Sequence, residues 1–177
     1  MGSPQRHLRL SARLLILLGV FITLSGITVA ASAVSLPLSV AQSYSSQVAS
    51  IPPTTGNIFL NNVQIALIEI IPGFGPVFGA YTSYETGLAL SAIAETTGQG
   101  LISGLESFLV LLFTPIYWLE FFSYSLAVEE SLAIIISLRN RDFLKLEWKW
   151  LIGSILTMGV VLLVSAYLEA TFVGLFG

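Results

Sequence analysis

Residues 101–138, LISGLESFLVLLFTPIYWLEFFSYSLAVEESLAIIISL, are apolar over most of their length and contain no lysine or arginine. A helix needs about 20 mostly apolar residues to cross the ~30 Å hydrocarbon core of a bilayer, so this segment is longer than one span requires. Its strongest breaker is Thr114-Pro115, and proline is favoured at the first position of a helix. We expect a half-length helix at 101–113 and a full span at about 115–138. The alternative is one kinked helix.

The whole chain shares this apolar character. Hydrophobic residues make up 55% of its 177 positions and charged residues 10%, whereas roughly 25% of a typical soluble domain is charged. Such a small number of charges cannot cover a water-facing surface of this size. We therefore expect the chain to lie in a lipid bilayer. The sequence predicts an all-α fold, a polytopic bundle forming a single membrane domain over residues 1–177, located in the cell membrane.

The first span is expected at residues 14–34, directly after three arginines. A cleaved signal peptide is the alternative reading, because Ala31-Ser32-Ala33 fits the small-residue cleavage pattern. The apolar stretch is longer than the usual signal core, which favours a retained anchor. Residues 36–57 are uncharged, rich in serine and glutamine, and closed by two prolines, so we predict an external loop there.

A broken helix pair is predicted at residues 57–95. Its interruption is Pro72-Gly73-Phe74-Gly75-Pro76, where two prolines and two glycines would stop or turn any helix. Pro72, Pro76 and Pro115 are thus the expected helix breaks of the chain. The glycines do not form a nucleotide-binding loop, because GFGPVFG at residues 73–79 does not match G-x-G-x-x-G and follows no predicted strand.

Small residues recur every four positions along the second helix of this pair. In lipid, such a stripe lets two helix backbones approach closely. We expect the stripe to pack mainly against another helix of the same chain, with a second subunit as the alternative. Its members are Gly75, Gly79, Ser83, Gly87 and Ser91.

Basic residues fix the expected orientation. They occur only in residues 6–13 and 139–149, and the positive-inside rule places both segments in the cytoplasm. Residues 139–150 are amphipathic and predict a cytoplasmic segment lying along the headgroups, and residues 151–175 predict the last span. An even number of crossings must separate the two basic segments. We therefore predict about five spans, including broken or half-length helices, with a cytoplasmic N-terminus.

Glutamates within the apolar segments are the strongest functional signal. An ionised side chain at mid-bilayer costs about 2.5–3.5 kcal/mol on insertion scales, so such residues usually face the bundle interior. No lysine or arginine lies between Arg13 and Arg139 to pair with them. A protonated carboxyl acting as a structural hydrogen bond between helices is the alternative role. Glu95, Glu106, Glu129 and Glu130 are expected near the membrane surface and hydrated. The candidate polar membrane site comprises Asn61, Asn62, Glu69, Glu120 and Glu169.

The residue inventory argues against catalysis. The chain has no cysteine, its one histidine is His7 in the basic tail, and its one aspartate is Asp142 in the second basic segment. Intramembrane aspartyl, serine–histidine and zinc chemistry each need residues that the apolar segments lack. We predict no catalytic residues, no metal site and no cofactor, and we expect no nucleic acid partner.

Four segments resemble motifs of the stage II sporulation protein M family of membrane proteins. Residues 58–67, IFLNNVQIAL, are similar to that family's I-F-x-N-N-x-R-x-A-L, and residues 87–91 to its N-G-x-x-x-G. Pro115 and Glu120 keep the spacing of its P-H-G-x-x-E, and residues 164–172 are similar to its A-A-x-I-E-A-x-x-T ending. Ile116 and Gln64 stand where the family usually has histidine and arginine. The resemblance spans residues 58–173 and implies a membrane scaffold.

Two functions follow as hypotheses. The first is a non-catalytic membrane scaffold or subunit of a membrane complex, whose partners would be other membrane proteins or further copies of this chain. The second is a small transporter or channel subunit, because two broken helices resemble those that frame midplane binding sites in transporters. In that case Glu69 and Glu120 would bind a cation or a proton.

Overall fold

The computed structural model describes residues 10–50, 52–97, 103–138 and 144–176. These residues form seven helices and no strand, so the all-α prediction is confirmed. The helices are α1 (Leu10–Ser32), α2 (Leu38–Ala49), α3 (Thr55–Glu69), α4 (Gly75–Thr96), α5 (Ser103–Leu112), α6 (Pro115–Leu138) and α7 (Leu144–Phe176).

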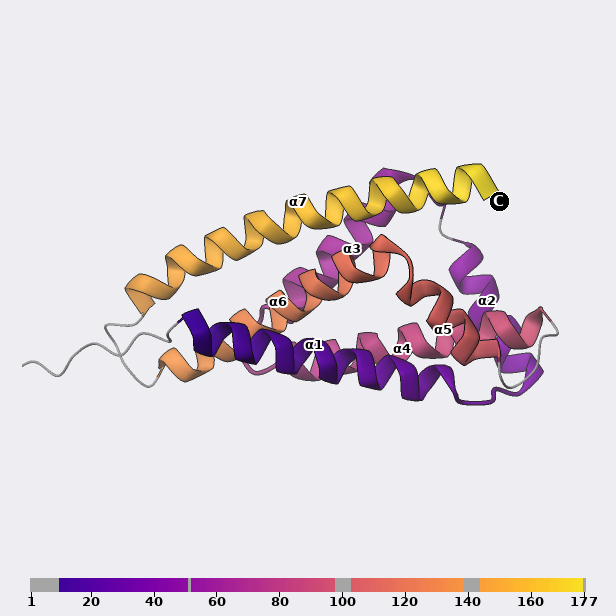
Figure 1. The fold of residues 1–177 in the computed structure, drawn as a ribbon, viewed down its shortest axis with the longest axis horizontal. Helices are drawn as coiled ribbons and strands as arrows, with labels where there is room; N and C mark the ends of the chain where they lie inside the picture. The colour runs from indigo at the N-terminus through magenta and orange to yellow at the C-terminus, as the bar shows by residue number, and fades with distance from the viewer. Residues whose placement is uncertain (1–9, 51, 98–102, 139–143, 177) are drawn as a thin grey trace, which may run out of the picture.

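The helix α6 lies at the centre of the arrangement and packs against both α1 and α7. The helix α4 lies along α1, and α3 lies along α7 (Figure 1). The short helices α2 and α5 pack against α4 near one end of the molecule. At the opposite end, the beginnings of α1 and α7 meet the end of α6, so the two predicted cytoplasmic ends lie together.

Fewer helices qualify as membrane spans than the five predicted. In the described ranges, two helical segments, within α1 and α7, are long and apolar enough to cross a membrane, and α5 with α6 makes a third if that bent pair is one span. The helix α3 has 15 residues and is only ~22 Å long at 1.5 Å per residue. The helix α4 is long enough at 22 residues, but its glycine, serine, threonine and glutamate residues make it less apolar.

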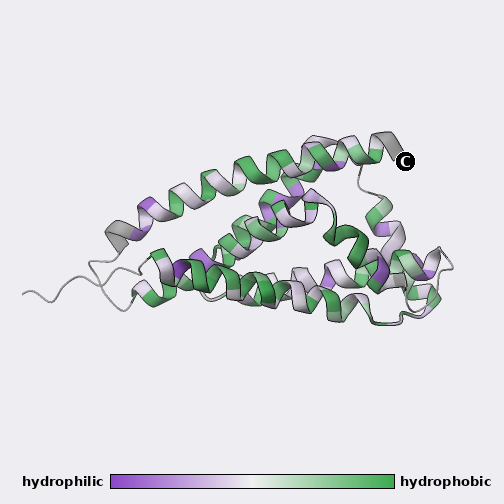
Figure 2. Ribbon diagram, viewed as in Figure 1, coloured by the Kyte–Doolittle hydropathy of each residue, from purple (hydrophilic) through white to green (hydrophobic). Residues whose placement is uncertain are grey.

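The interior of the protein is more polar than much of its surface. Leu15 of α1 and Leu156 of α7 are 70% and 65% exposed, whereas Glu69 and Ser125 are fully buried. Hydrophobic residues run along most of α1 and α7 (Figure 2). A water-soluble protein would reverse this distribution. The pattern therefore fits helices that present apolar side chains to lipid and keep polar ones inside.

The loop predicted at residues 36–57 is wrong over most of its length, because α2 occupies its centre. The sequence between Pro37 and Pro52 contains no glycine or proline, so nothing in it breaks a helix. The helix packs against α4 and buries Ala41 completely. Burial of one face stabilises a helix whose serines and glutamines would favour it little in isolation.

Both predicted interruptions of helices are present. Between α3 and α4, Gly73 has a positive φ of 82°, a conformation that glycine adopts without steric cost. At the second break, α5 and α6 meet at an angle of 88°, so they are two helices rather than one kinked helix. Thr114 Oγ1 accepts a hydrogen bond from the Tyr117 amide at 3.4 Å, and the Trp118 indole donates to the Leu112 carbonyl at 2.9 Å. These bonds satisfy backbone groups that the break leaves without helical partners.

The helix α7 corrects a further boundary. The amphipathic segment and the last span were predicted as separate elements, but from Leu144 onward they form one uninterrupted helix. No proline or glycine lies between residues 144 and 152 to separate them. Residues 139–143 lie outside the described part of the chain. Trp148 and Trp150 are both exposed in the first turns of α7.

The stripe of small residues on α4 is buried within the chain. A Cβ atom at Gly87 would clash with the Thr28 carbonyl oxygen and the Ala31 side chain of α1, and one at Gly79 would lie 2.8 Å from Val128 of α6. The stripe therefore brings α4 close to both α1 and α6. Gly104 of α5, which is not part of the predicted stripe, makes a similar close approach to Ser32.

The close approach at Gly87 can be tested by adding one methyl group. We expect Gly87→Ala to force α1 and α4 apart and to lower the free energy of unfolding by about 1–3 kcal/mol, as overpacking does. The measurement is thermal unfolding of the purified protein in detergent. Gly26→Ala is the matched control, because nothing lies within 4 Å of its new Cβ. Equal melting temperatures for the two variants would contradict the tight α1–α4 contact.

Candidate functional site

A polar cavity of about 260 Å³ lies among α3, α4, α5 and α6. The helices α3 and α4 diverge from their shared break (Figure 1), and residues of both helices line the cavity together with Leu111 of α5. Its walls combine carboxylates, hydroxyls, amides and aromatic rings, so it can accept a ligand that is both charged and partly apolar. The lining residues are Asn61, Asn62, Ile65, Tyr81, Thr82, Ser83, Glu85, Thr86, Leu111, Tyr117, Glu120, Phe121 and Tyr124.

Glu120 is held in this cavity by two other helices. The Asn62 side-chain amide of α3 donates a hydrogen bond to Glu120 Oε1 at 2.6 Å, and the Ser165 hydroxyl of α7 donates to the same oxygen at 3.3 Å. Within the described part of the chain, Oε2 of Glu120 accepts no hydrogen bond. One carboxylate oxygen therefore fixes the side chain, and the other remains available to a proton or a ligand.

Asn61 and Glu169 lie beside this pair. The Asn61 amide donates to Asn62 Oδ1 at 3.3 Å, which leaves the Asn62 amide group oriented toward Glu120. Glu169 is close enough to Glu120 for the two carboxylates to repel each other if both are ionised. Four of the five predicted polar site residues are thus brought together from α3, α6 and α7. Such proximity of two carboxylates favours a shared proton or a bound cation.

Glu69, the fifth predicted residue, lies behind the cavity wall. It is fully buried, and its Oε1 accepts a hydrogen bond from Thr82 Oγ1 at 3.0 Å, while its Oε2 has no hydrogen-bond partner among the described residues. Gly79 allows this approach, because a Cβ there would already lie 3.5 Å from Oε1. A buried carboxylate oxygen without a partner carries a large desolvation cost, which protonation of the carboxyl relieves.

The rim of the cavity is tied to α2. The Tyr44 hydroxyl of α2 donates to Glu85 Oε2 at 3.1 Å. Burial, and then the hydrogen bond to Glu85, raise the pKa of Tyr44 above its usual value of 10.0, so the hydroxyl remains a donor at neutral pH. This contact was not predicted, because residues 36–57 were expected to form a loop.

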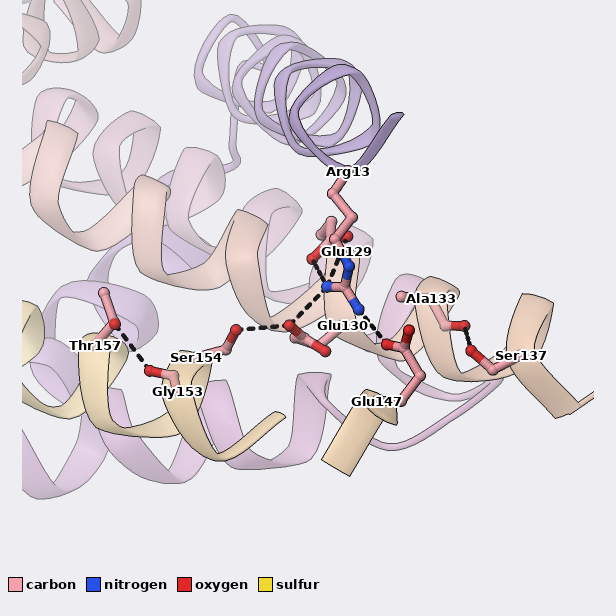
Figure 3. Close-up of polar contacts among 9 residues, drawn as sticks. All are labelled: Arg13, Glu129, Glu130, Ala133, Ser137, Glu147, Gly153, Ser154 and Thr157. Carbon is pink, nitrogen blue, oxygen red and sulfur yellow. Dashed lines mark hydrogen bonds and ion pairs between the residues drawn. The ribbon is translucent and has the colours of Figure 1, made fainter. Parts of the chain in front are cut away.

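A second buried polar cluster centres on Arg13 in the first turn of α1 (Figure 3). Its Nη1 donates to Glu130 Oε1 at 2.9 Å and to Glu129 Oε2 at 3.2 Å, and its Nη2 bonds Glu147 of α7. Ser154 of α7 donates to Glu130 Oε1 at 2.6 Å. The guanidinium therefore joins α1, α6 and α7.

The cluster corrects the expectation that Glu129 and Glu130 are hydrated. Both are buried, since the planar guanidinium with its several donors can serve more than one carboxylate at once. The guanidinium carbon also lies 5.1 Å from the centre of the Trp150 ring, within the range of a cation–π contact. Glu95 is partly exposed and Glu106 is exposed, so neither belongs to a buried cluster.

Removing Arg13 should destabilise the fold more than removing a surface charge. Arg13→Gln leaves two buried glutamates of α6 without their cation. We expect the free energy of unfolding to fall by about 3–5 kcal/mol, which is typical of removing one partner of a buried ion pair. Lys149→Gln is the control, because Lys149 is exposed near the same end. Thermal unfolding in detergent measures both. Adding Glu129→Gln and Glu130→Gln to Arg13→Gln should restore part of the lost stability. The prediction fails if Arg13→Gln and Lys149→Gln have the same melting temperature.

Comparison with known proteins does not assign a function to this site. No protein-family model, no curated protein and no solved structure matches the chain. The function must therefore be argued from the two buried polar clusters and the cavity.

Proposed function

We propose that this chain is a non-catalytic, multi-pass protein of the cell membrane that binds a proton or a cation at Glu120, as a small transporter or channel subunit would. The observation that carries the proposal is the position of Glu120. Asn62 and Ser165 hold one of its carboxylate oxygens, and the other makes no hydrogen bond to any residue that the structure describes, although Glu120 lines the cavity. A carboxylate used only to join helices would be more stable if both of its oxygens accepted hydrogen bonds.

The charge balance of the apolar segments supports this proposal. Residues 14–138 contain no lysine or arginine, so the cavity carboxylates have no cationic side chain nearby within these segments. Ionisable residues inside a membrane are costly and commonly mark the path of an ion or proton. Neutralisation of Glu120 must come from a proton or from a mobile cation, and either fits a transported species.

The interrupted helices also support it. In several transporter folds, binding sites lie where discontinuous helices expose backbone groups near the midplane. Here the cavity is lined by α3 and α4, which flank one interruption, and by α5 and α6, which flank the other. We propose that α3 and α4 enter the membrane as a pair between the apolar spans, giving the five-segment arrangement predicted from the sequence.

The proposal predicts loss of flux in Glu120→Gln. Glutamine keeps the size and hydrogen bonding of the side chain but cannot bind a proton or hold a negative charge. In proteoliposomes energised by a potassium diffusion potential and loaded with a pH-sensitive dye, or with a sodium-sensitive dye in a parallel set, we expect the wild type to carry protons or Na⁺. Glu120→Gln should lose at least about 90% of that flux.

Glu106→Gln is the matched control for this experiment, because Glu106 is an exposed glutamate of α5. It should retain wild-type flux. If wild-type vesicles are no more permeable to H⁺, Na⁺ or K⁺ than empty vesicles, or if Glu120→Gln is as permeable as the wild type, transport through this site is ruled out.

A membrane scaffold is the second candidate, and one observation favours it. The resemblance to the stage II sporulation protein M family rests on separated motifs, and three of these motifs contribute to one cluster, because Asn62 bonds Glu120 and Glu169 lies nearby. We propose membership of that family on this basis. In a scaffold the cluster would fix the relative positions of α3, α6 and α7.

The scaffold proposal predicts partners. Crosslinking in native membranes followed by purification should recover this chain with other membrane proteins or with further copies of itself, and Glu120→Gln should keep those partners because an amide preserves the hydrogen bonds. Recovery of the protein only as a lone monomer contradicts the scaffold proposal.

A further inference from the structure

We propose that the ligand of the cavity is a small organic ammonium ion. This inference rests on the proposed function, because it names the chemical class of the cation held by Glu120. It draws on three properties of the cavity: the sign of its charge, the aromatic groups in its wall, and its size.

The charged groups of the cavity wall all have one sign. Glu85 and Glu120 line it, and no lysine or arginine is present in any of the helices that contribute lining residues. An anion entering the cavity would meet two carboxylates and no compensating charge. A neutral ligand would leave Glu120 without a counter-ion. The electrostatics therefore select a cation.

Aromatic side chains make up a large share of the same wall. Tyr81 comes from α4, and Tyr117, Phe121 and Tyr124 come from successive turns of α6. Tyr117 stacks on Phe121 with ring centres 4.4 Å apart, and Tyr124 meets Phe121 edge-on at 6.4 Å, so these three rings of α6 pack against one another in the wall. The face of an aromatic ring attracts ammonium groups, and aromatic cages are a known means of binding them.

A divalent metal ion fits the wall less well. Hard divalent cations take six or more oxygen ligands, several of them carboxylates. In the described ranges of the chain, no three histidine, cysteine, aspartate or glutamate side chains are grouped as a metal site. An ammonium ion needs fewer oxygens, because one carboxylate can balance its charge while its carbon atoms contact rings.

The volume limits the size of the ligand. A cavity of about 260 Å³ lies just below the range of roughly 300–1,000 Å³ that holds drug-sized ligands. The ion therefore carries few non-hydrogen atoms beyond its nitrogen. In the bound state, the charged nitrogen lies beside Glu120 Oε2, and the methyl or methylene groups lie against the rings of Tyr81 and Tyr124.

The test measures binding of methylammonium and tetramethylammonium to the purified full chain in detergent, by isothermal titration calorimetry at constant ionic strength. We expect both ions to bind and tetrabutylammonium, which is too large, not to bind. Glu120→Gln should abolish binding. Tyr81→Leu should weaken the binding affinity roughly 2- to 30-fold, the range expected for loss of one cation–π contact. Tyr81→Phe should keep the wild-type affinity, because the ring remains.

Tyr84→Leu is the matched control for the aromatic contact. Tyr84 is an exposed residue one turn further along α4 and does not line the cavity. Tyr124→Leu and Tyr124→Phe repeat the comparison on α6, with melting temperatures measured for every variant to separate lost binding from lost folding. Because Tyr81 is 55% exposed, its substitution should leave the fold intact.

The outcomes separate this inference from the proposed function. If Na⁺ or proton flux depends on Glu120 but neither ammonium ion binds, the inference is wrong and the transport proposal stands. The inference is also overturned if Tyr81→Phe weakens binding as much as Tyr81→Leu, because the hydroxyl rather than the ring would then be the contact. If no cation binds or crosses at all, both are wrong.

Discussion

The ion cluster around Arg13 is the constraint on which the arrangement of the long helices depends. A single guanidinium bonds Glu129 and Glu130 of α6 and Glu147 of α7, and all of these groups are buried. In an apolar environment, no solvent replaces a lost partner, so the three helices can separate only at a large electrostatic cost. Apolar contacts with lipid are not directional and cannot fix helix positions in this way. The cluster therefore sets which ends of α1, α6 and α7 lie together.

The helix α6 joins the two polar regions of the molecule. Its second half carries the glutamates bound by Arg13, and its first half carries Glu120 and the rings that line the cavity. The two regions differ in how their charges are balanced. At the beginning of α1 the carboxylates face a fixed cation, whereas in the cavity Glu120 accepts hydrogen bonds from an amide and a hydroxyl. The first region is suited to holding the fold, and the second to exchanging a proton or a cation.

Local features of the chain were predictable from the sequence, and long-range pairings were not. Pro72, Pro76 and Pro115 mark real helix interruptions, since proline and glycine act on the backbone whatever surrounds them. The grouping of Asn62 with Glu120 was anticipated because both are polar residues in apolar segments that cannot face lipid. The partnership of Arg13 with Glu129 joins residues 116 positions apart, and no local pattern reports it. The helix α2 was missed because its stability comes from packing on α4 rather than from its own composition.

The separation between Arg13 and its partners also bears on the order of events during biosynthesis. Arg13 leaves the ribosome more than a hundred residues before Glu129, Glu130 and Glu147. Until those glutamates are inserted, its guanidinium has no buried counter-ion, and hydration at the membrane surface is the lowest-energy alternative. We expect α1 to lie near the membrane surface at first and to reach its final depth only when α6 and α7 have been inserted. The first helix to be synthesised is thus the last to reach its final position in the membrane.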